Sequence, residues 1–274
     1  MKLSNHSLFI FECFAFNSSF CSTVNFSNIE IFVQNSNDGW LVLICWSSAN
    51  IVATSISYIM LKKEGFEIKV PDIRSVFREL AQSSGFFWSR IAVVFYTSLG
   101  SVLVGTISLS QAAMYTSAEQ IYKAGQAVTQ PITQALYPYM AKEKDWKLFY
   151  GILTKALIIL VIGVGIVYIG RNYLVQTAFG DGFEDAVPIL SIFLMINIIN
   201  FLGVNFGYPA FAAMSRTDIA NNSVILGCVY FITHISVVYN LEKLSGINVA
   251  YAVLATEILV MAVRVTYFLK LKYK

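Results

Sequence analysis

Seven long apolar stretches constrain this chain more than any other feature of its sequence. They lie at about 40–61, 86–108, 113–139, 149–169, 186–207, 219–239 and 248–269. A helix needs about 20 mostly apolar residues to cross the roughly 30 Å hydrocarbon core of a bilayer. Only 13% of the 274 residues are charged, against about 25% in soluble domains, and the mean hydropathy is +0.64. We therefore predict an all-α, polytopic membrane helix bundle of about seven spans.

The basic residues predict how these spans are oriented. If the connections alternate between the two sides, one set comprises 62–85, 140–148, 208–218 and 270–274. This set holds twelve Lys and Arg residues, whereas the opposite set holds only Arg171 and Lys243. Cytoplasmic loops carry the excess of Lys and Arg. The C-terminus is therefore expected in the cytoplasm.

The same pattern predicts four regions. Residues 1–39 form an atypical N-terminal segment, which we leave unassigned and which is no convincing signal peptide. A single transmembrane helix follows at 40–61, and then a cytoplasmic linker at 62–85. Ile73, Val76, Phe77 and Leu80 share one face in this linker, which indicates an amphipathic helix on the membrane surface. Residues 86–274 form a six-helix transmembrane lobe.

The span 113–139 carries a polar arc along one face. At 100° per residue, its members fall within about 100° of one another. They are Glu119, Lys123, Gln126, Gln130, Thr133, Gln134 and Tyr137. A charged residue at the centre of a span costs about 2.5–3.5 kcal/mol, so this face is expected to meet water or protein rather than lipid.

Each intramembrane charge has a structural interpretation beside a functional one. Glu119 and Lys123 stand four residues apart and either pair with each other or serve a ligand or coupling ion. Arg90 either faces the polar path or extends to the inner interface. Glu257 is a second candidate for ion coupling, and it could instead pair with Arg264, two turns further along its helix.

Composition argues against several classes of protein. A net charge of +3 is too weak to indicate nucleic-acid binding. The four cysteines form no CxxC pair, and with two histidines they predict neither a metal site nor a disulfide array. No cofactor and no enzymatic activity are expected.

Three stretches carry a family resemblance. They are SSGFFWSRIAVVFYTSLGSVLVG at 83–105, QAAMYTSAEQIYKAGQAVTQPITQALYPYMAK at 111–142 and FGDGFEDAVPILSIFLMINIINFLGVNFGYPAF at 179–211. With their order, they resemble bacterial O-antigen flippases of the Wzx type. This is the polysaccharide transporter branch of the multidrug/oligosaccharidyl-lipid/polysaccharide exporter superfamily. The resemblance covers about residues 45–274 and excludes 1–39.

The resemblance implies a fold of two six-helix lobes around a central cavity. The helix at 40–61 would be the last of the first lobe, and the six later spans would form the second lobe. Most of a first lobe would then be missing, and a truncated or frameshifted reading frame would explain this.

The resemblance also implies a function. An undecaprenyl-pyrophosphate-linked oligosaccharide would cross the bacterial inner membrane by alternating access. Arg90 and Lys123 would attract the pyrophosphate, while Gln126, Gln130 and Gln134 would bind sugar hydroxyls. The expected partners are this lipid-linked oligosaccharide, the bilayer, and an O-antigen polymerase and chain-length regulator. Three alternatives remain: a cation-coupled multidrug exporter of the same superfamily, a membrane enzyme of O-antigen assembly (a polymerase or glycosyltransferase), and an inactive fragment.

Overall fold

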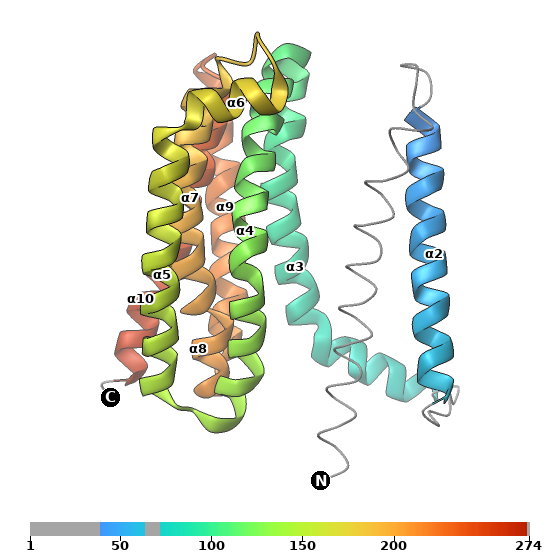
Figure 1. Cartoon of the computed structure of the whole chain (residues 1–274). Coiled ribbons are helices and arrows are strands. Elements are labelled where there is room, and N and C mark those ends of the chain that lie inside the picture. The colour runs from blue at the N-terminus through green and yellow to red at the C-terminus, as the bar shows by residue number, and fades with distance from the viewer. Residues whose placement is uncertain (1–38, 64–71, 273–274) are drawn as a thin grey trace. The chain divides into compact units, whose positions relative to one another are not determined.

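The structure, a computed structural model, describes residues 39–63 and 72–272. The predicted segment 1–39 lies almost wholly outside these residues. The chain divides into two units, Met1–Val76 and Phe77–Lys274, and the division falls inside the predicted linker 62–85. In the described ranges every regular element is a helix, as Figure 1 shows. The all-α prediction is confirmed.

Each of the seven expected spans coincides with a helix. These helices are α2 (Gly39–Lys63), α3 (Ile73–Ile107), α4 (Leu109–Glu143), α5 (Trp146–Ile169), α7 (Ala186–Asn205), α9 (Thr217–Asn240) and α10 (Gly246–Lys272). Two shorter helices were not expected: α6 (Arg171–Phe179) and α8 (Tyr208–Ala213). Both lie in segments that the sequence analysis assigned to connections.

Five stretches of the described residues are long and apolar enough to cross a membrane. They are Phe87–Ile107, Trp146–Ile169, Ala186–Ala213, Thr217–Asn240 and Gly246–Lys272. The chain is therefore a multi-pass membrane protein. The expected spans in α2 and α4 are not among the five, although these helices have 25 and 35 residues. In α4, the charges and amides of the polar arc offset its few strongly apolar residues.

The predicted amphipathic helix is not a separate element. It forms the first part of α3, which runs without interruption from Ile73 to Ile107 and bends on the way (Figure 1). Phe77 and Leu80 of this first part are exposed, as a helix on a membrane surface requires.

Helix α7 lies at the centre of the second unit. It packs against α4 and α10 along most of its length and also contacts α5, α6 and α8. The aromatic rings of Tyr115 and Tyr122 on α4 meet Phe193 on α7, with ring centroids 5.3 and 5.2 Å apart. These contacts fix how α4 is rotated about its own axis, and so they decide which part of the polar arc is buried.

The turn between α4 and α5 sets these two helices side by side. Lys144 adopts a left-handed conformation, with φ of 55°, and ends α4. The Asp145 carboxylate then accepts hydrogen bonds from the backbone N–H groups of Lys147 and Leu148 at 3.0 and 3.1 Å. This is an N-cap, which satisfies donors that the first turn of a helix leaves unpaired.

Candidate functional site

The structure divides the polar arc of α4 into two edges. One edge consists of Gln126 and Thr133, which are half-buried and face α7. We call it the sealed edge. The Gln126 Nε2 donates to Asn200 Oδ1 at 2.9 Å, and the Thr133 hydroxyl donates to Asn205 Oδ1 at 3.3 Å. The sealed edge therefore joins α4 to α7 through polar side chains.

The other edge consists of Lys123, Gln130 and Gln134, whose side chains are exposed. We call it the open edge. Tyr137, at the centre of the arc, is also exposed. Apart from the ion pair of Lys123, no side-chain partner of the open edge occurs among the described residues. In a membrane-spanning bundle such a surface needs water, a ligand or further protein against it.

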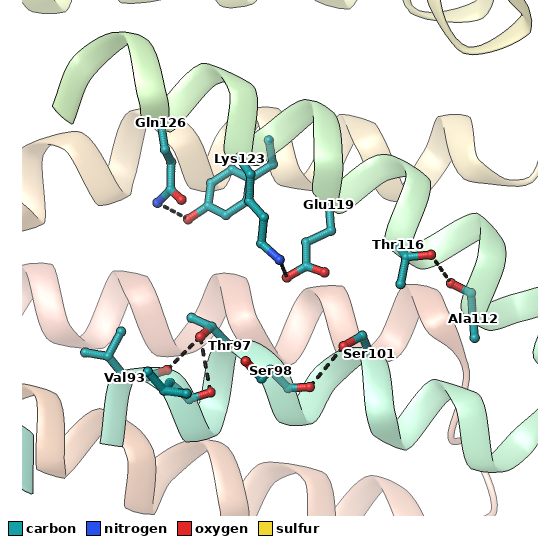
Figure 2. Close-up of polar contacts among 11 residues, drawn as sticks. Val93, Thr97, Ser98, Ser101, Ala112, Thr116, Glu119, Lys123 and Gln126 are labelled. Carbon is teal, nitrogen blue, oxygen red and sulfur yellow. Dashed lines mark hydrogen bonds and ion pairs between the residues drawn. The ribbon is translucent and has the colours of Figure 1, made fainter. Parts of the chain in front are cut away.

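Glu119 and Lys123 form the ion pair that their spacing predicts. The Lys123 Nζ lies 2.9 Å from Glu119 Oε1, and the side chains are 60% and 9% exposed, respectively. The ammonium group therefore stays accessible while the carboxylate is covered. Figure 2 shows the pair above α3.

Two hydroxyl groups of α3 bond within their own helix. Thr97 donates to the carbonyl oxygen of Val93 at 2.8 Å, and Ser101 donates to that of Ser98 at 3.0 Å (Figure 2). A hydroxyl that donates in this way keeps oxygen lone pairs, so it still accepts hydrogen bonds. Thr97 and Ser101 therefore give α3 two hydroxyl groups that can accept hydrogen bonds.

A buried polar network connects α3, α4, α7 and α10. We call it the central network, and it consists of Tyr96, Tyr122, Gln126, Asn200 and Glu257. Glu257 is 5% exposed. Its carboxylate accepts from the Tyr96 hydroxyl at 2.9 Å and from Asn200 Nδ2 at 3.1 Å. The Gln126 Nε2 also donates to the Tyr122 hydroxyl at 2.7 Å.

Glu257 and Arg264 form no ion pair, although the sequence had left this alternative open. Arg264 is 4% exposed and donates instead to Ser223 Oγ, to the carbonyl oxygen of Gly203 and to that of Ala220, at 2.8, 2.7 and 3.3 Å. Two turns of α10 separate the two side chains, and each finds nearer partners on the helices packed against it. Arg264 thereby connects α10 to α7 and α9.

Arg90 belongs to a second group of polar residues, at the end of the bundle where α10 ends. We call this group the arginine cluster, and it consists of Ser89, Arg90, Tyr208, Asn221 and Arg264. The guanidinium carbon of Arg90 lies 5.8 Å from the centre of the Tyr208 ring. Arg90 itself is exposed. The structure does not bring Arg90 into contact with the arc of α4.

Sequence reasoning missed four asparagines, two of which, Asn200 and Asn205, accept hydrogen bonds from the polar arc. Asn197, Asn200 and Asn205 lie on α7, and Asn221 lies on α9. Each of the three on α7 is a single amide in an apolar run, where averaged hydropathy hides it. A search for lone amides in apolar spans would have found these three, whereas Asn221 is followed by Asn222 near the polar start of α9. Gly125 was missed as well: a Cβ atom there would collide with the Asn197 Nδ2.

No metal site is apparent in the part of the chain that the structure describes. No group of three or more His, Cys, Asp or Glu side chains lies close enough to hold an ion there. Cys228 is half-buried on α9 with a free thiol.

Comparisons with known proteins support the resemblance. Residues 22–144 match the model of a family described as polysaccharide biosynthesis protein. A protein of Escherichia coli (strain K12) named "Putative O-antigen transporter" is 30% identical over 186 residues, which are 64% of this chain and 45% of that relative. The match thus spans less than half of the relative's length. No solved structure matches the chain.

These matches agree with the resemblance that the sequence indicated: parts of the chain are similar to a polysaccharide biosynthesis family and to a protein named as an O-antigen transporter. They correct the boundary of the resemblance, however. The family match begins at residue 22, so part of the segment 1–39 lies inside the resemblance rather than outside it.

Proposed function

We propose that this relative of the polysaccharide transporters takes part in moving an undecaprenyl-pyrophosphate-linked O-antigen oligosaccharide across the bacterial inner membrane. The observation that carries the proposal is the open edge of α4: Lys123, Gln130 and Gln134 are exposed on a helix inside a multi-pass bundle. An oligosaccharide needs such a wet path, because its hydroxyl groups lose their hydrogen bonds in hydrocarbon. The lipid tail stays in the bilayer.

The side chains of the open edge suit the two parts of the substrate. Gln130 and Gln134 offer amide donors and acceptors to sugar hydroxyls. Lys123 offers an accessible ammonium group, which binds phosphate as a point charge. Gln126 is not part of this exposed surface, because its Nε2 already donates hydrogen bonds to Asn200 and Tyr122. We assign it to holding the open edge in place.

Transport of O antigen is what the Escherichia coli relative is named for. The finer part of the proposal is alternating access, in which the open edge faces the cytoplasm and the periplasm in turn. An O-antigen polymerase and a chain-length regulator are the partners that would use the delivered substrate.

The orientation rests on the basic residues. With the C-terminus and the loop 140–148 in the cytoplasm, twelve basic residues lie inside and two lie outside. Single cysteines at Lys144 and Asp181, in a chain without native cysteines, test this with a reagent that does not cross the membrane. Labelling is expected at residue 181 alone. Labelling at residue 144 alone would reverse the orientation.

Export in cells tests the proposal. A strain that lacks its O-antigen transporter receives this chain, alone or joined to the first half of the Escherichia coli relative. The double variant Gln130→Leu/Gln134→Leu is expected to abolish surface O antigen at an unchanged level of membrane protein. The matched control is Gln120→Leu, which changes an exposed amide of α4 outside the polar arc. Equal export from both variants would refute a role of the open edge in transport.

A further inference from the structure

A cavity of about 420 Å³ lies where α6 crosses the end of the bundle, opposite the end that carries the C-terminus (Figure 1). It is lined by one face of α6, by the turn that follows, and by the start of α7. We call it the α6 pocket. Its volume falls within the roughly 300–1,000 Å³ of small-molecule sites in proteins. Of the described residues, none that belongs to the polar arc, the central network or the arginine cluster lines it. The α6 pocket is therefore separate from the site described above.

Two sets of residues with the same spacing form the walls of the α6 pocket. The set on α6 consists of Asn172, Val175 and Gln176. The set at the start of α7 consists of Glu184, Val187 and Pro188. Residues at i, i+3 and i+4 share one face of a helical turn, so each set presents a single face to the cavity. Both faces combine hydrogen-bonding side chains with apolar ones, as small-molecule sites do.

The turn between α6 and α7 holds the pocket in one shape. The Gln176 Nε2 donates to Asp181 Oδ1 at 2.7 Å, and the backbone N–H of Gly182 donates to Glu184 Oε1 at 3.3 Å. Gly182 has a φ of 95°, a conformation that side chains other than glycine rarely adopt. The polar walls are thus positioned before a ligand arrives, which lowers the entropic cost of binding.

The side chains of the pocket match the two kinds of surface that a sugar ring presents. Asn172 and Gln176 carry amides, which both donate to and accept from hydroxyl groups. The Glu184 carboxylate is a strong acceptor for a hydroxyl group. Phe183 also lines the cavity, and its ring stacks on that of Phe179 with centroids 5.7 Å apart. The negative face of an aromatic ring attracts the C–H groups on the face of a sugar.

The charge of the pocket selects among sugars. Residues 170–185 hold three carboxylates, those of Asp181, Glu184 and Asp185, and a single cation, Arg171. The guanidinium carbon of Arg171 lies 4.2 Å from the ring centre of Tyr168, and its Nη1 donates to the Tyr168 carbonyl oxygen at 2.7 Å. Arg171 is thus occupied outside the pocket, whose potential is negative. Such a potential repels sugar acids and phosphates, so an uncharged sugar fits best.

We infer that the α6 pocket binds an uncharged sugar ring of a glycan. Two sources offer this chemistry. One is the oligosaccharide that the chain is proposed to move, and this source rests on the proposed function. The basic-residue count places the α6 end outside the cytoplasm, where that oligosaccharide leaves the protein. The other source is a free saccharide on the same side of the membrane.

Saturation-transfer NMR of the full chain in lipid nanodiscs tests the pocket, with empty nanodiscs as the background. The probes are the methyl glycosides of glucose, galactose, N-acetylglucosamine and glucuronic acid. We expect transfer to at least one of the three uncharged glycosides. Glucuronic acid should bind about tenfold more weakly than the best of them, because its carboxylate meets those of the pocket. No transfer to any uncharged glycoside, or equal binding of the glucuronide, would overturn the inference.

Two variants with matched controls locate the binding. Asn172→Leu should weaken it about fivefold and Glu184→Gln about tenfold, since a neutral and a charge-assisted hydrogen bond are lost. The controls are Asn240→Leu and Glu242→Gln, which change exposed residues outside the pocket, where α9 ends. Asn172 is exposed, so its variant keeps the fold even if Glu184→Gln loosens the turn. Equal losses in variants and controls would overturn the assignment to the α6 pocket.

The export experiment separates the two sources. If the pocket receives the transported oligosaccharide, Asn172→Leu lowers surface O antigen several-fold and Asn240→Leu leaves it unchanged. If the ligand is a free saccharide, the two variants export equally. Binding of a methyl glycoside stands even if the chain exports no O antigen. Absence of binding refutes the pocket and leaves the proposed function, which rests on the open edge, unaffected.

Discussion

The sealed and open edges of α4 carry the same kind of side chain, glutamine, but the two edges have different roles. Gln126 lies on one edge and Gln130 on the other, a single turn further along the helix. Gln126 bonds to Asn200 in the protein interior, while Gln130 is exposed. The two residues are of the same type and belong to the same polar arc, so contact with the neighbouring helix α7 determines whether the amide is bonded to protein or exposed. Polar residues inside a membrane protein therefore divide into those that hold helices together and those that remain for a ligand.

Loss of Asn200, which bonds to the sealed edge, should have the largest effect on stability. Asn200→Leu leaves the amide of Gln126 and the carboxylate of Glu257 each without one partner. A hydrogen bond between neutral groups contributes about 0.5–1.5 kcal/mol and one to a charged group about 1.5–3 kcal/mol, so the free energy of unfolding should fall by about 3 kcal/mol. Unfolding of the purified protein in mixed micelles, followed by circular dichroism, measures this.

The matched change on the open edge is Gln130→Leu, which should alter stability by less than about 0.5 kcal/mol. A loss at Gln130 as large as that at Asn200 would show that the two edges do not differ.

A substitution at the point where α4 closely approaches α7 should have the next largest effect on stability. Gly125→Ala adds a Cβ atom that collides with the Asn197 side chain, and such overpacking costs about 1–3 kcal/mol. Gly163→Ala on α5 is the control, because nothing lies within 4 Å of a Cβ atom there. Thermal unfolding in detergent should show a lower midpoint for the first variant and an unchanged or higher one for the second. The reverse order would contradict the packing of α4 on α7.

Chemical accessibility sharpens the comparison residue by residue. Single cysteines in place of Lys123, Gln130 and Gln134 should react with a small water-soluble thiol reagent about tenfold faster than cysteines at Gln126 and Thr133. The reason is that the thiolate needs water to form and to meet the reagent. Initial rates in membranes, in a chain cleared of native cysteines, provide the measurement. Equal rates at all five positions would remove the distinction between the edges.

Loss of the ion pair should also have only a small effect on stability. Lys123 is 60% exposed, so its attraction to Glu119 is screened, and Lys123→Gln should cost less than about 1 kcal/mol. Export should nevertheless fall if the ammonium binds phosphate, and Lys123→Arg should retain it. Full export from Glu119→Gln/Lys123→Gln would instead make the pair purely structural. Surface O antigen, corrected for protein level, is the measurement.

The helices were predictable from sequence because each apolar run is long enough to stand out on its own. The two short helices were not. Helix α8 follows a break at Gly207, and Arg264 donates a hydrogen bond to the carbonyl oxygen of Gly203 in the last turn before that break. Arg264 belongs to α10, far along the chain, so the local sequence around α8 does not predict this contact.

The residues of the candidate site were predictable in part. Spacing on α4 found the arc and the Glu119–Lys123 pair, which are properties of one helix. It could not divide the arc into two edges, because that depends on the rotation of α4 against α7. It also failed for Glu257, which bonds to Tyr96 and Asn200 on two other helices rather than to Arg264 on its own. Contacts between helices need the tertiary structure.

The polarity of α4 also has a consequence for synthesis. A helix that carries Glu119 and Lys123 partitions poorly into lipid by itself, and the amides that satisfy its sealed edge lie on α7. The ribosome adds roughly 5–20 residues per second, so α4 emerges several seconds before α7. During that interval α4 has to stay at the translocation channel or in contact with water. Its insertion is thus tied to the arrival of α7, and the order of synthesis becomes part of how the polar path is assembled.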